Sequence, residues 1–309
     1  MALSPTMPPI QPGQDPVALF EAHRAEIRRQ KLWINLLLLG GFVAMLLWSI
    51  DVSRFWPDRL AAGVPRIFEY FGSVLPSFQW DLLFETRNAE GRFPPGSIGF
   101  WYNDFWKYLA LIWETILMAI TATLIATALS VVLSFLAARN LTPAPWVSTA
   151  ARRFLEFCRG VPEILFALIF VFAVGIGPLA GILAITIHAT GALGKLFAEV
   201  NENASMKPVD GLTAVGGTWA QRMRYGVLPQ VLPNFTSYAL WRFEINVRAS
   251  AVVGFVGAGG IGAELNHVIS FYSDDRVTAV LLLVVLTVTA IDLMSERARH
   301  ALIGKEALK

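Results

Sequence analysis

The stretch that decides the fold is an uncharged run in the middle of the chain. Residues 164–194 read ILFALIFVFAVGIGPLAGILAITIHATGALG, which is 31 residues without a formal charge. One membrane crossing needs about 20 apolar residues, and the Gly-Ile-Gly-Pro sequence at 175–178 can interrupt a helix. We therefore predict two membrane crossings joined by a tight turn.

Three further runs have the same character. Residues 32–50 are uncharged, residues 109–138 carry only Glu114, and residues 277–294 carry only Asp292. Each is long enough to cross a bilayer once. These runs add three predicted spans to the two of the central stretch.

One remaining candidate span is interrupted by charge. Residues 225–241 are uncharged, and then Arg242, Glu244 and Arg248 precede a second uncharged run at 249–263. We interpret residues 232–255 as one polar-faced span. The sequence therefore predicts an all-α polytopic membrane protein with six transmembrane helices.

The basic residues test this count, because cytoplasmic loops carry an excess of Lys and Arg. With six spans and both termini inside, sixteen of the 25 basic residues fall on the inner side and seven on the outer side. Six of those seven lie in residues 51–108, where seven acidic residues offset them. We therefore expect both termini to be cytoplasmic.

The predicted spans set the domain organisation. The outer segment is rich in proline and tryptophan, so we expect amphipathic pieces that lie along the outer membrane surface. A long cytoplasmic loop is expected at about 200–229. The parts are a cytoplasmic tail and helix at 1–31, a first span at 32–50, an outer segment at 51–108, a five-helix core at 109–296 and a cytoplasmic tail at 297–309.

Composition excludes several classes of function. Of the 309 residues 55% are hydrophobic and 16% are charged, and the net charge of +2 argues against a general nucleic-acid-binding surface. Cys158 is the single cysteine, so neither an internal disulfide nor a multi-cysteine metal site can form. The sequence contains no GxxxxGK[ST] or HExxH motif, and its four histidines are scattered. We predict a non-catalytic chain without a cofactor or metal of its own.

A glycine-rich stretch offers one false lead. Residues 257–262, Gly-Ala-Gly-Gly-Ile-Gly, match the dinucleotide-binding pattern GxGxxG. However, no acidic residue follows at the required distance, no alternating strands and helices surround it, and the loop charges place it outside. We interpret it as a glycine-rich helix end that permits close backbone packing or a hinge.

The most informative segment lies between the fourth and fifth predicted spans. Residues 210–229 read DGLTAVGGTWAQRMRYGVLP. Gly216 permits a tight turn, residues 217–224 can form a short helix, and Pro229 can begin the next span. A rigid cytoplasmic projection of this kind is what a soluble motor needs in order to move a membrane protein.

This segment resembles the EAA loop of ATP-binding-cassette (ABC) importer permeases, E-A-A-x3-G-x9-I-x-L-P. The spacing is intact, although Gly211, Leu212 and Gly226 replace the two alanines and the isoleucine. Trp219 and Met223, four positions apart, predict an apolar face for a partner's groove. The resemblance implies coupling to a cytoplasmic ATPase through Asp210, Gly216, Trp219, Met223, Leu228 and Pro229.

Three longer stretches resemble the phosphonate-type branch of these permeases. They contain FLAARNLTP at 135–143, RGVPEI at 159–164 and FEINVRASAVVGFVGAGGIG at 243–262. The resemblance implies a type I, MetI-like permease fold in the bacterial inner membrane. It also implies a homodimer, two ATPase subunits that bind ATP and Mg, and a periplasmic binding protein that delivers phosphonate, phosphite or hypophosphite.

The intramembrane charges are the candidate residues of a substrate path, because such charges are costly unless they are paired or face water. Glu244 and Arg248 have the spacing and order of a helical ion pair, which leaves Arg242 as a spare positive charge. Guanidinium suits the oxygens of an oxyanion. Glu163 and Glu114 line the same path or pair with these arginines, and structural pairing is favoured for both.

Other functions stay open at this point. An ion-driven secondary transporter or channel would have a similar hydropathy pattern, and its uptake would survive vanadate but collapse with uncouplers. An intramembrane hydrolase would need a paired nucleophile and base, and His188, Asp292 and Glu114 have no familiar spacing for that role. The same permease fold could also carry a different small solute, such as an amino acid.

Overall fold

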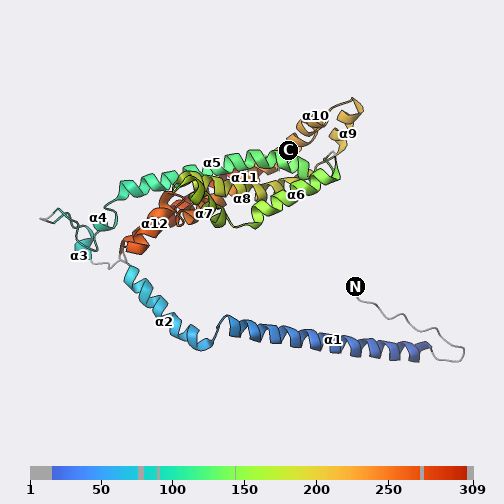
Figure 1. Cartoon of the computed structure of the whole chain (residues 1–309), viewed down its shortest axis with the longest axis horizontal. Coiled ribbons are helices and arrows are strands. Elements are labelled where there is room, and N and C mark those ends of the chain that lie inside the picture. Colours follow the sequence, from blue (N-terminus) through green and yellow to red (C-terminus); the bar gives the residue numbers. More distant parts are fainter. Residues whose placement is uncertain (1–15, 76–79, 89–90, 143, 272–274, 305–309) are drawn as a thin grey trace. The chain divides into compact units, whose positions relative to one another are not determined.

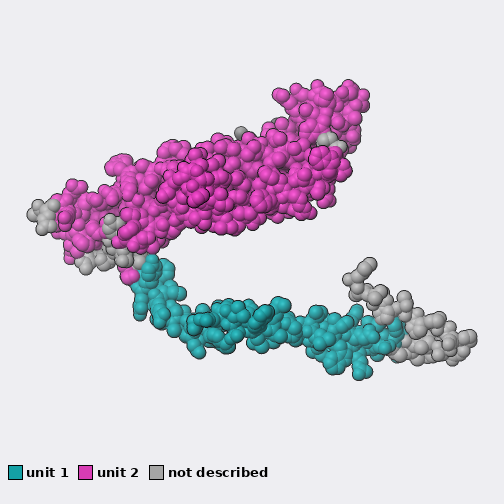
Figure 2. All heavy atoms as spheres, in the orientation of Figure 1, with its two compact units in different colours: residues 1–72 teal, residues 73–309 magenta. Residues whose placement is uncertain are grey.

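The structure is a computed structural model that describes residues 16–75, 80–88, 91–142, 144–271 and 275–304. Every regular element in these residues is helical (Figure 1). The chain divides into two units, residues 1–72 and 73–309 (Figure 2). The start of the predicted N-terminal tail (1–15), the end of the C-terminal tail (305–309) and residue 143 of the FLAARNLTP stretch lie outside the described residues.

The first unit consists of two helices. α1 (Pro16–Val52) runs without a break through both the predicted cytoplasmic helix and the predicted first span. α2 (Pro57–Val74) begins with proline and has Asp58 in its first turn, where the partial positive charge of a helix N-terminus favours an acid. The exposed apolar side chains of α2 recur at the spacing of one helix face, as expected for a helix at a membrane surface: Leu60, Val64, Ile67, Phe68 and Phe71.

The second unit is a bundle of long helices with short helices at both ends. Its long axis is set by α5, α8 and α11, which pack together along their lengths (Figure 1). The helices in chain order are α3 (Trp80–Leu83), α4 (Ile98–Trp101), α5 (Phe105–Ala137), α6 (Pro145–Gly160), α7 (Glu163–Val174), α8 (Pro178–Glu202), α9 (Lys207–Ala214), α10 (Trp219–Gln221), the π-helix η1 (Arg222–Val227), α11 (Leu228–Gly254), α12 (Gly260–Phe271) and α13 (Asp275–Gly304).

Four of the described helices are long and apolar enough to cross a membrane. They lie in α1, α5, α8 and α13, and α6 with α7 makes a fifth candidate that bends by 85°. α11 is not among them, although its 27 residues are long enough for a span. These apolar helices support an integral membrane protein, and the sixth span remains a prediction for α11.

The break predicted inside residues 164–194 falls at the expected place. α7 ends at Val174 and is followed by Gly175 (φ 89°), and α8 begins with Pro178 after Gly177 (φ 148°). Both glycines have positive φ, which other residues rarely adopt. α7 is shorter than the prediction required: its 12 residues extend about 18 Å, whereas a bilayer core is about 30 Å thick.

The glycine-rich stretch separates α11 from α12, a helix that the sequence did not predict. Gly257 and Gly259 have φ of 91° and 82°. The two helices approach so closely that a Cβ on Gly262 would lie 1.8 Å from the carbonyl oxygen of Ala251. The glycines therefore serve backbone packing, as the sequence indicated, and not the binding of a dinucleotide.

The bundle interior combines apolar packing with paired polar groups. Phe197 and Phe235 stack with ring centroids 3.9 Å apart. Asn246 of α11 donates from Nδ2 to Oγ1 of Thr123 on α5, at 2.9 Å, and both residues are buried. Hydrogen bonds between helices of this kind favour association in a membrane, where water cannot satisfy the same groups.

Candidate functional site

The first candidate site is a buried positive charge near the middle of α11. Arg242 is only 9% exposed. Its Nε is buried and has no hydrogen-bond partner in the part of the chain that the structure describes. Burial of a cation is unfavourable unless a partner compensates it, which makes this guanidinium a candidate for anion binding.

One carboxylate from another helix acts on this arginine's charge, and a histidine lies beside that carboxylate. The carboxylate of Glu163, the first residue of α7, interacts electrostatically with Arg242. His188 of α8 lies with its Nε2 3.6 Å from Oε2 of Glu163, and its Nδ1 is 3.0 Å from the carbonyl oxygen of Val161. The sequence indicated Glu163 but did not connect His188 with it, because residues 25 positions apart reveal no contact before the fold is known.

The other two charges of α11 form a separate network. Arg248 pairs with Glu244 at 3.2 Å, which is the predicted helical ion pair. Two residues of α13 extend this network. Arg299 lies 3.0 Å from Glu244, and Asp292 lies 3.2 Å from Arg248. Because each carboxylate is matched by an arginine, this network ties α11 to α13 and leaves Arg242 as the charge without a matching ion pair in the described residues.

Glu114 does not join these arginines. Its Oε1 accepts a hydrogen bond from the backbone N–H of Gly260 at 3.0 Å, and Oγ1 of the adjacent Thr115 accepts from the N–H of Ile261 at 2.9 Å. These two N–H groups belong to the first turn of α12, where helix donors need acceptors. The sequence prediction that Glu114 pairs with an intramembrane arginine is therefore replaced by a role in holding the glycine-rich turn.

The second candidate site is the segment from α9 to the start of α11, which we call the coupling projection (residues 207–229). Figure 1 shows α9 and α10 at the opposite end of the second unit from α12. Gly216 makes the predicted turn with φ 79°, and Pro229 lies in the first turn of α11. Thr218 and Gln221 form a capping box that starts α10.

The side chains of Trp219 and Met223 face their own chain and not outward. Met223 is 6% exposed and packs with Val209 and Val227. Trp219 donates from Nε1 to the carbonyl oxygen of Leu141 at 2.7 Å. The expected apolar face for a partner is therefore not formed by this pair, because both side chains contribute to the core that supports the projection.

Exposed residues of the coupling projection are found instead at its tip and outer flank. Val215 is 80% exposed and Tyr225 is 62% exposed. Asp210 and Gly216 are also exposed, whereas Leu228 packs partly against the core beneath them. A partner that binds the coupling projection would meet these side chains first.

Residues with metal-binding potential are dispersed. No group of three or more His, Cys, Asp or Glu side chains in the searched, described residues could hold a metal ion. The charged clusters described above consist of arginine, carboxylate and one histidine. Their chemistry is that of ion pairing and anion recognition.

Comparison with known families identifies the core of the chain. Residues 130–302 match the family described as the binding-protein-dependent transport system inner membrane component. This match covers α8, α11, α12 and most of α13, together with the coupling projection. It therefore includes both candidate sites.

Two curated relatives come from Stutzerimonas stutzeri. HtxC, whose name assigns it to a phosphite transport system as a permease, is 33% identical over 287 residues, which are 93% of each chain. The phosphite transport system permease protein PtxC is 42% identical over 194 residues, or 63% of this chain and 70% of PtxC.

A solved structure has the same fold. A chain of the inward-facing MetNI methionine ABC transporter aligns with a TM-score of 0.56 over 65% of this chain and 98% of that chain. Its sequence identity of 21% supports similarity of fold alone. The helical arrangement of the second unit is therefore one already known in transport proteins.

Proposed function

Because this chain belongs to the family of binding-protein-dependent transport system inner membrane components, we propose that it is the permease of an ATP-driven importer for a phosphorus oxyanion. Phosphonate, phosphite and hypophosphite are the expected substrates. The observation that carries the proposal is the similarity to a phosphite permease along nearly the whole length of both chains. A relative that matches over only one segment would support the fold without supporting the solute.

Arg242 supplies the chemistry that this substrate class needs. A phosphorus oxyanion presents several negatively charged oxygens, and guanidinium binds such oxygens through charge-assisted hydrogen bonds. The Nε of Arg242 has no partner in the described residues, whereas Glu244, Arg248, Asp292 and Arg299 are already matched with one another. We assign Arg242 to the substrate path, with Glu163 as its electrostatic partner and His188 beside Glu163.

The coupling projection is the proposed contact with the motor. Two cytoplasmic ATPase subunits, which hold ATP and Mg themselves, would bind the exposed tip around Val215 and Gly216. A second copy of this chain would complete the path, and a periplasmic binding protein would deliver the oxyanion. This permease contributes no catalysis and no cofactor of its own.

The proposed orientation follows the basic residues. Both termini and the coupling projection lie in the cytoplasm of a bacterium, and the 51–108 segment lies along the outer face of its inner membrane. The five-helix core at 109–296 then carries the path. ATP-driven closure of the motors would bring the two projections together and open the path outward, and hydrolysis would restore the inward-facing state.

The experiment is an uptake assay with labelled phosphite or phosphonate in cells that express the complete transporter. We expect uptake to stop when vanadate inhibits the ATPase subunits and to persist when an uncoupler removes the proton gradient. Uptake that survives vanadate and collapses with the uncoupler would identify an ion-driven transporter instead. Vanadate-sensitive uptake of an amino acid alone would retain the importer and reject the oxyanion.

A further inference from the structure

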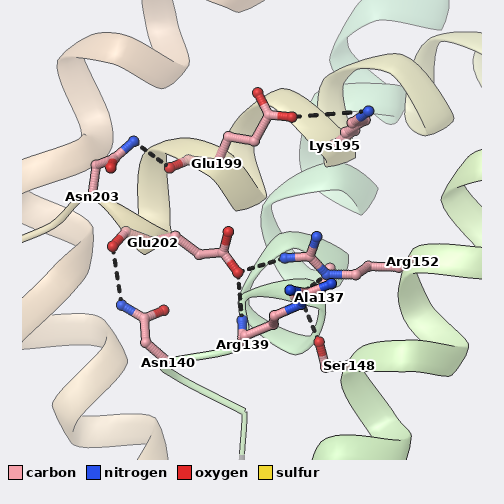
Figure 3. A network of polar contacts seen from close by, with 9 residues as sticks. All are labelled: Ala137, Arg139, Asn140, Ser148, Arg152, Lys195, Glu199, Glu202 and Asn203. Atoms are coloured by element: carbon pink, nitrogen blue, oxygen red, sulfur yellow. Dashed lines mark hydrogen bonds and ion pairs between the residues drawn. The ribbon is translucent and has the colours of Figure 1, made fainter. Parts of the chain in front are cut away.

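The connection that follows α5 is contacted both by the end of α8, just before the coupling projection, and by Trp219 within the projection. The first set of contacts is made by Glu202, the last residue of α8 (Figure 3). The carboxylate of Glu202 accepts a hydrogen bond from the backbone N–H of Arg139 at 2.8 Å and pairs with the guanidinium of Arg152 on α6. Asn140 adds a third link by donating from Nδ2 to the carbonyl oxygen of Glu202 at 3.2 Å.

The second contact comes from α10, within the coupling projection itself. The indole N–H of Trp219 donates to the carbonyl oxygen of Leu141. Leu141 is 4% exposed and belongs to the apolar cluster that includes Val209 and Val227, from either side of the projection's tip. A displacement of the projection would therefore act on this connection directly through Trp219 and, along the chain that joins α8 to α9, through Glu202.

Arg152 of α6 contacts both of the long helices α5 and α8. Arg152 donates from Nε to the carbonyl oxygen of Ala137, the last residue of α5, at 2.9 Å, while its terminal nitrogen pairs with Glu202. Ser148, also on α6, donates to the same Ala137 oxygen at 2.8 Å. Arg152 thus connects the middle of α6 with the end of α5 and the end of α8 (Figure 3).

We propose that Arg152 and Glu202 are positioning residues that transmit movement of the coupling projection to α5 and α6. This inference rests on the proposed function, since it assumes a motor that moves the projection. α5 is one uninterrupted helix of 33 residues, about 50 Å long. A rigid helix of that length carries a displacement at its cytoplasmic end to Glu114 and the glycine-rich turn at its other end.

The pair is suited to transmission more than to folding stability. The side chains of Arg152 and Glu202 are 27% and 29% exposed, and a partly exposed ion pair adds little to the free energy of unfolding. Its removal should therefore leave a folded permease that still binds its motor. The neighbouring pair of Arg153 and Glu156 lies on α6 alone, with Arg153 77% exposed, and provides a matched control.

The experiment measures solute imported per ATP hydrolysed by the complete transporter in proteoliposomes, with its binding protein and phosphite. For Arg152→Gln and for Glu202→Gln we expect ATP hydrolysis to continue and the ratio to fall about fivefold or more, the range of ordinary coupling between sites. The double variant should lose less than the sum of the two single losses, because both changes break the same ion pair. Arg153→Gln should keep the wild-type ratio.

Three results would overturn the inference. Glu202→Gln with a wild-type ratio would show that the link transmits nothing. Equal loss of hydrolysis and import, with the ratio unchanged, would assign the pair to stability or assembly alone. Additive losses in the double variant would mean that the residues act separately. A wild-type complex that hydrolyses ATP without importing any phosphorus oxyanion would instead reject the proposed function, and this inference with it.

Discussion

The Glu114 carboxylate accepts a hydrogen bond from the backbone N–H of Gly260, 3.0 Å away, and so connects α5 to the first turn of α12. Residues 146 positions apart in the chain thereby fix the turn that follows α11. The positive end of a helix favours an acidic partner, which explains how a carboxylate is tolerated inside an otherwise uncharged run. The glycine-rich turn is therefore held by a side chain of α5 as well as by its own backbone.

Replacement of Glu114 tests this connection. Glu114→Ala leaves the Gly260 N–H without its acceptor, and an unsatisfied buried donor costs about 1–3 kcal/mol. Glu114→Gln retains a side-chain oxygen at the same position and should lose less. The measurement is the free energy of unfolding of the purified permease in detergent. Equal stability of the alanine variant and the wild type would contradict a structural role for this hydrogen bond.

Close packing of α11 against α12 predicts that Gly262 cannot be replaced. A Cβ at this position would lie 1.8 Å from the Ala251 carbonyl oxygen, which is backbone and cannot rotate away. We expect Gly262→Ala to lower the free energy of unfolding by about 3 kcal/mol or to prevent folding. Gly211→Ala is the control, because Gly211 has open space in α9 and should change stability by at most about 1 kcal/mol. Similar stability of the two variants would refute the close approach.

The turn at Gly216 predicts a loss of transport without a loss of folding. Gly216→Pro cannot adopt φ 79° and loses the hydrogen bond that the Gly216 N–H donates to Thr213. Because Gly216 lies at the exposed tip, the bundle should fold while import falls to background.

Gly91 offers a closely matched control for this change. Its φ is 76°, its N–H donates to the carbonyl oxygen of Asn88, and nothing lies within 4 Å of its Cβ position. Gly91→Pro should therefore impose the same local strain and leave import intact. Retained import by Gly216→Pro would count against the coupling projection as the motor contact.

Arg242 predicts a specific defect in substrate transfer. Arg242→Ala removes a charge-assisted donor set and should lower the rate of oxyanion import about tenfold or more. Arg242→Lys keeps the charge but not the planar fork, so it should recover only part of that rate. Initial uptake rates across substrate concentration measure both variants, with Arg153→Ala as an exposed control. Unchanged kinetics in a normally inserted Arg242→Ala permease would remove Arg242 from the path.

Local spacing predicted those features that depend on one helix or one turn. The pair of Glu244 and Arg248 follows from four positions in a helix, and the turn at Gly216 follows from the freedom of glycine at positive φ. Asp292 and Arg299 could not be assigned to the same network, because their contacts depend on how α13 packs against α11. Individual membrane spans were likewise predictable only where the sequence has a long run without charge.

The sequence could not predict which neighbours the side chains would contact. Trp219 and Met223 have the spacing of one helix face, but spacing alone does not say whether that face meets a partner or the protein's own core. The link between Arg152 and Glu202 joins residues 50 positions apart, and no local pattern marks it. In both cases the packing of α5, α6 and α8 decides what the residue contacts.

The most direct test of the central claim is the ATPase activity of the reconstituted transporter with its binding protein, compared across phosphonates, phosphite, phosphate and amino acids. We predict that a phosphorus oxyanion stimulates ATP hydrolysis and that amino acids do not. Stimulation by an amino acid, with no response to any phosphorus oxyanion, would contradict the proposed substrate.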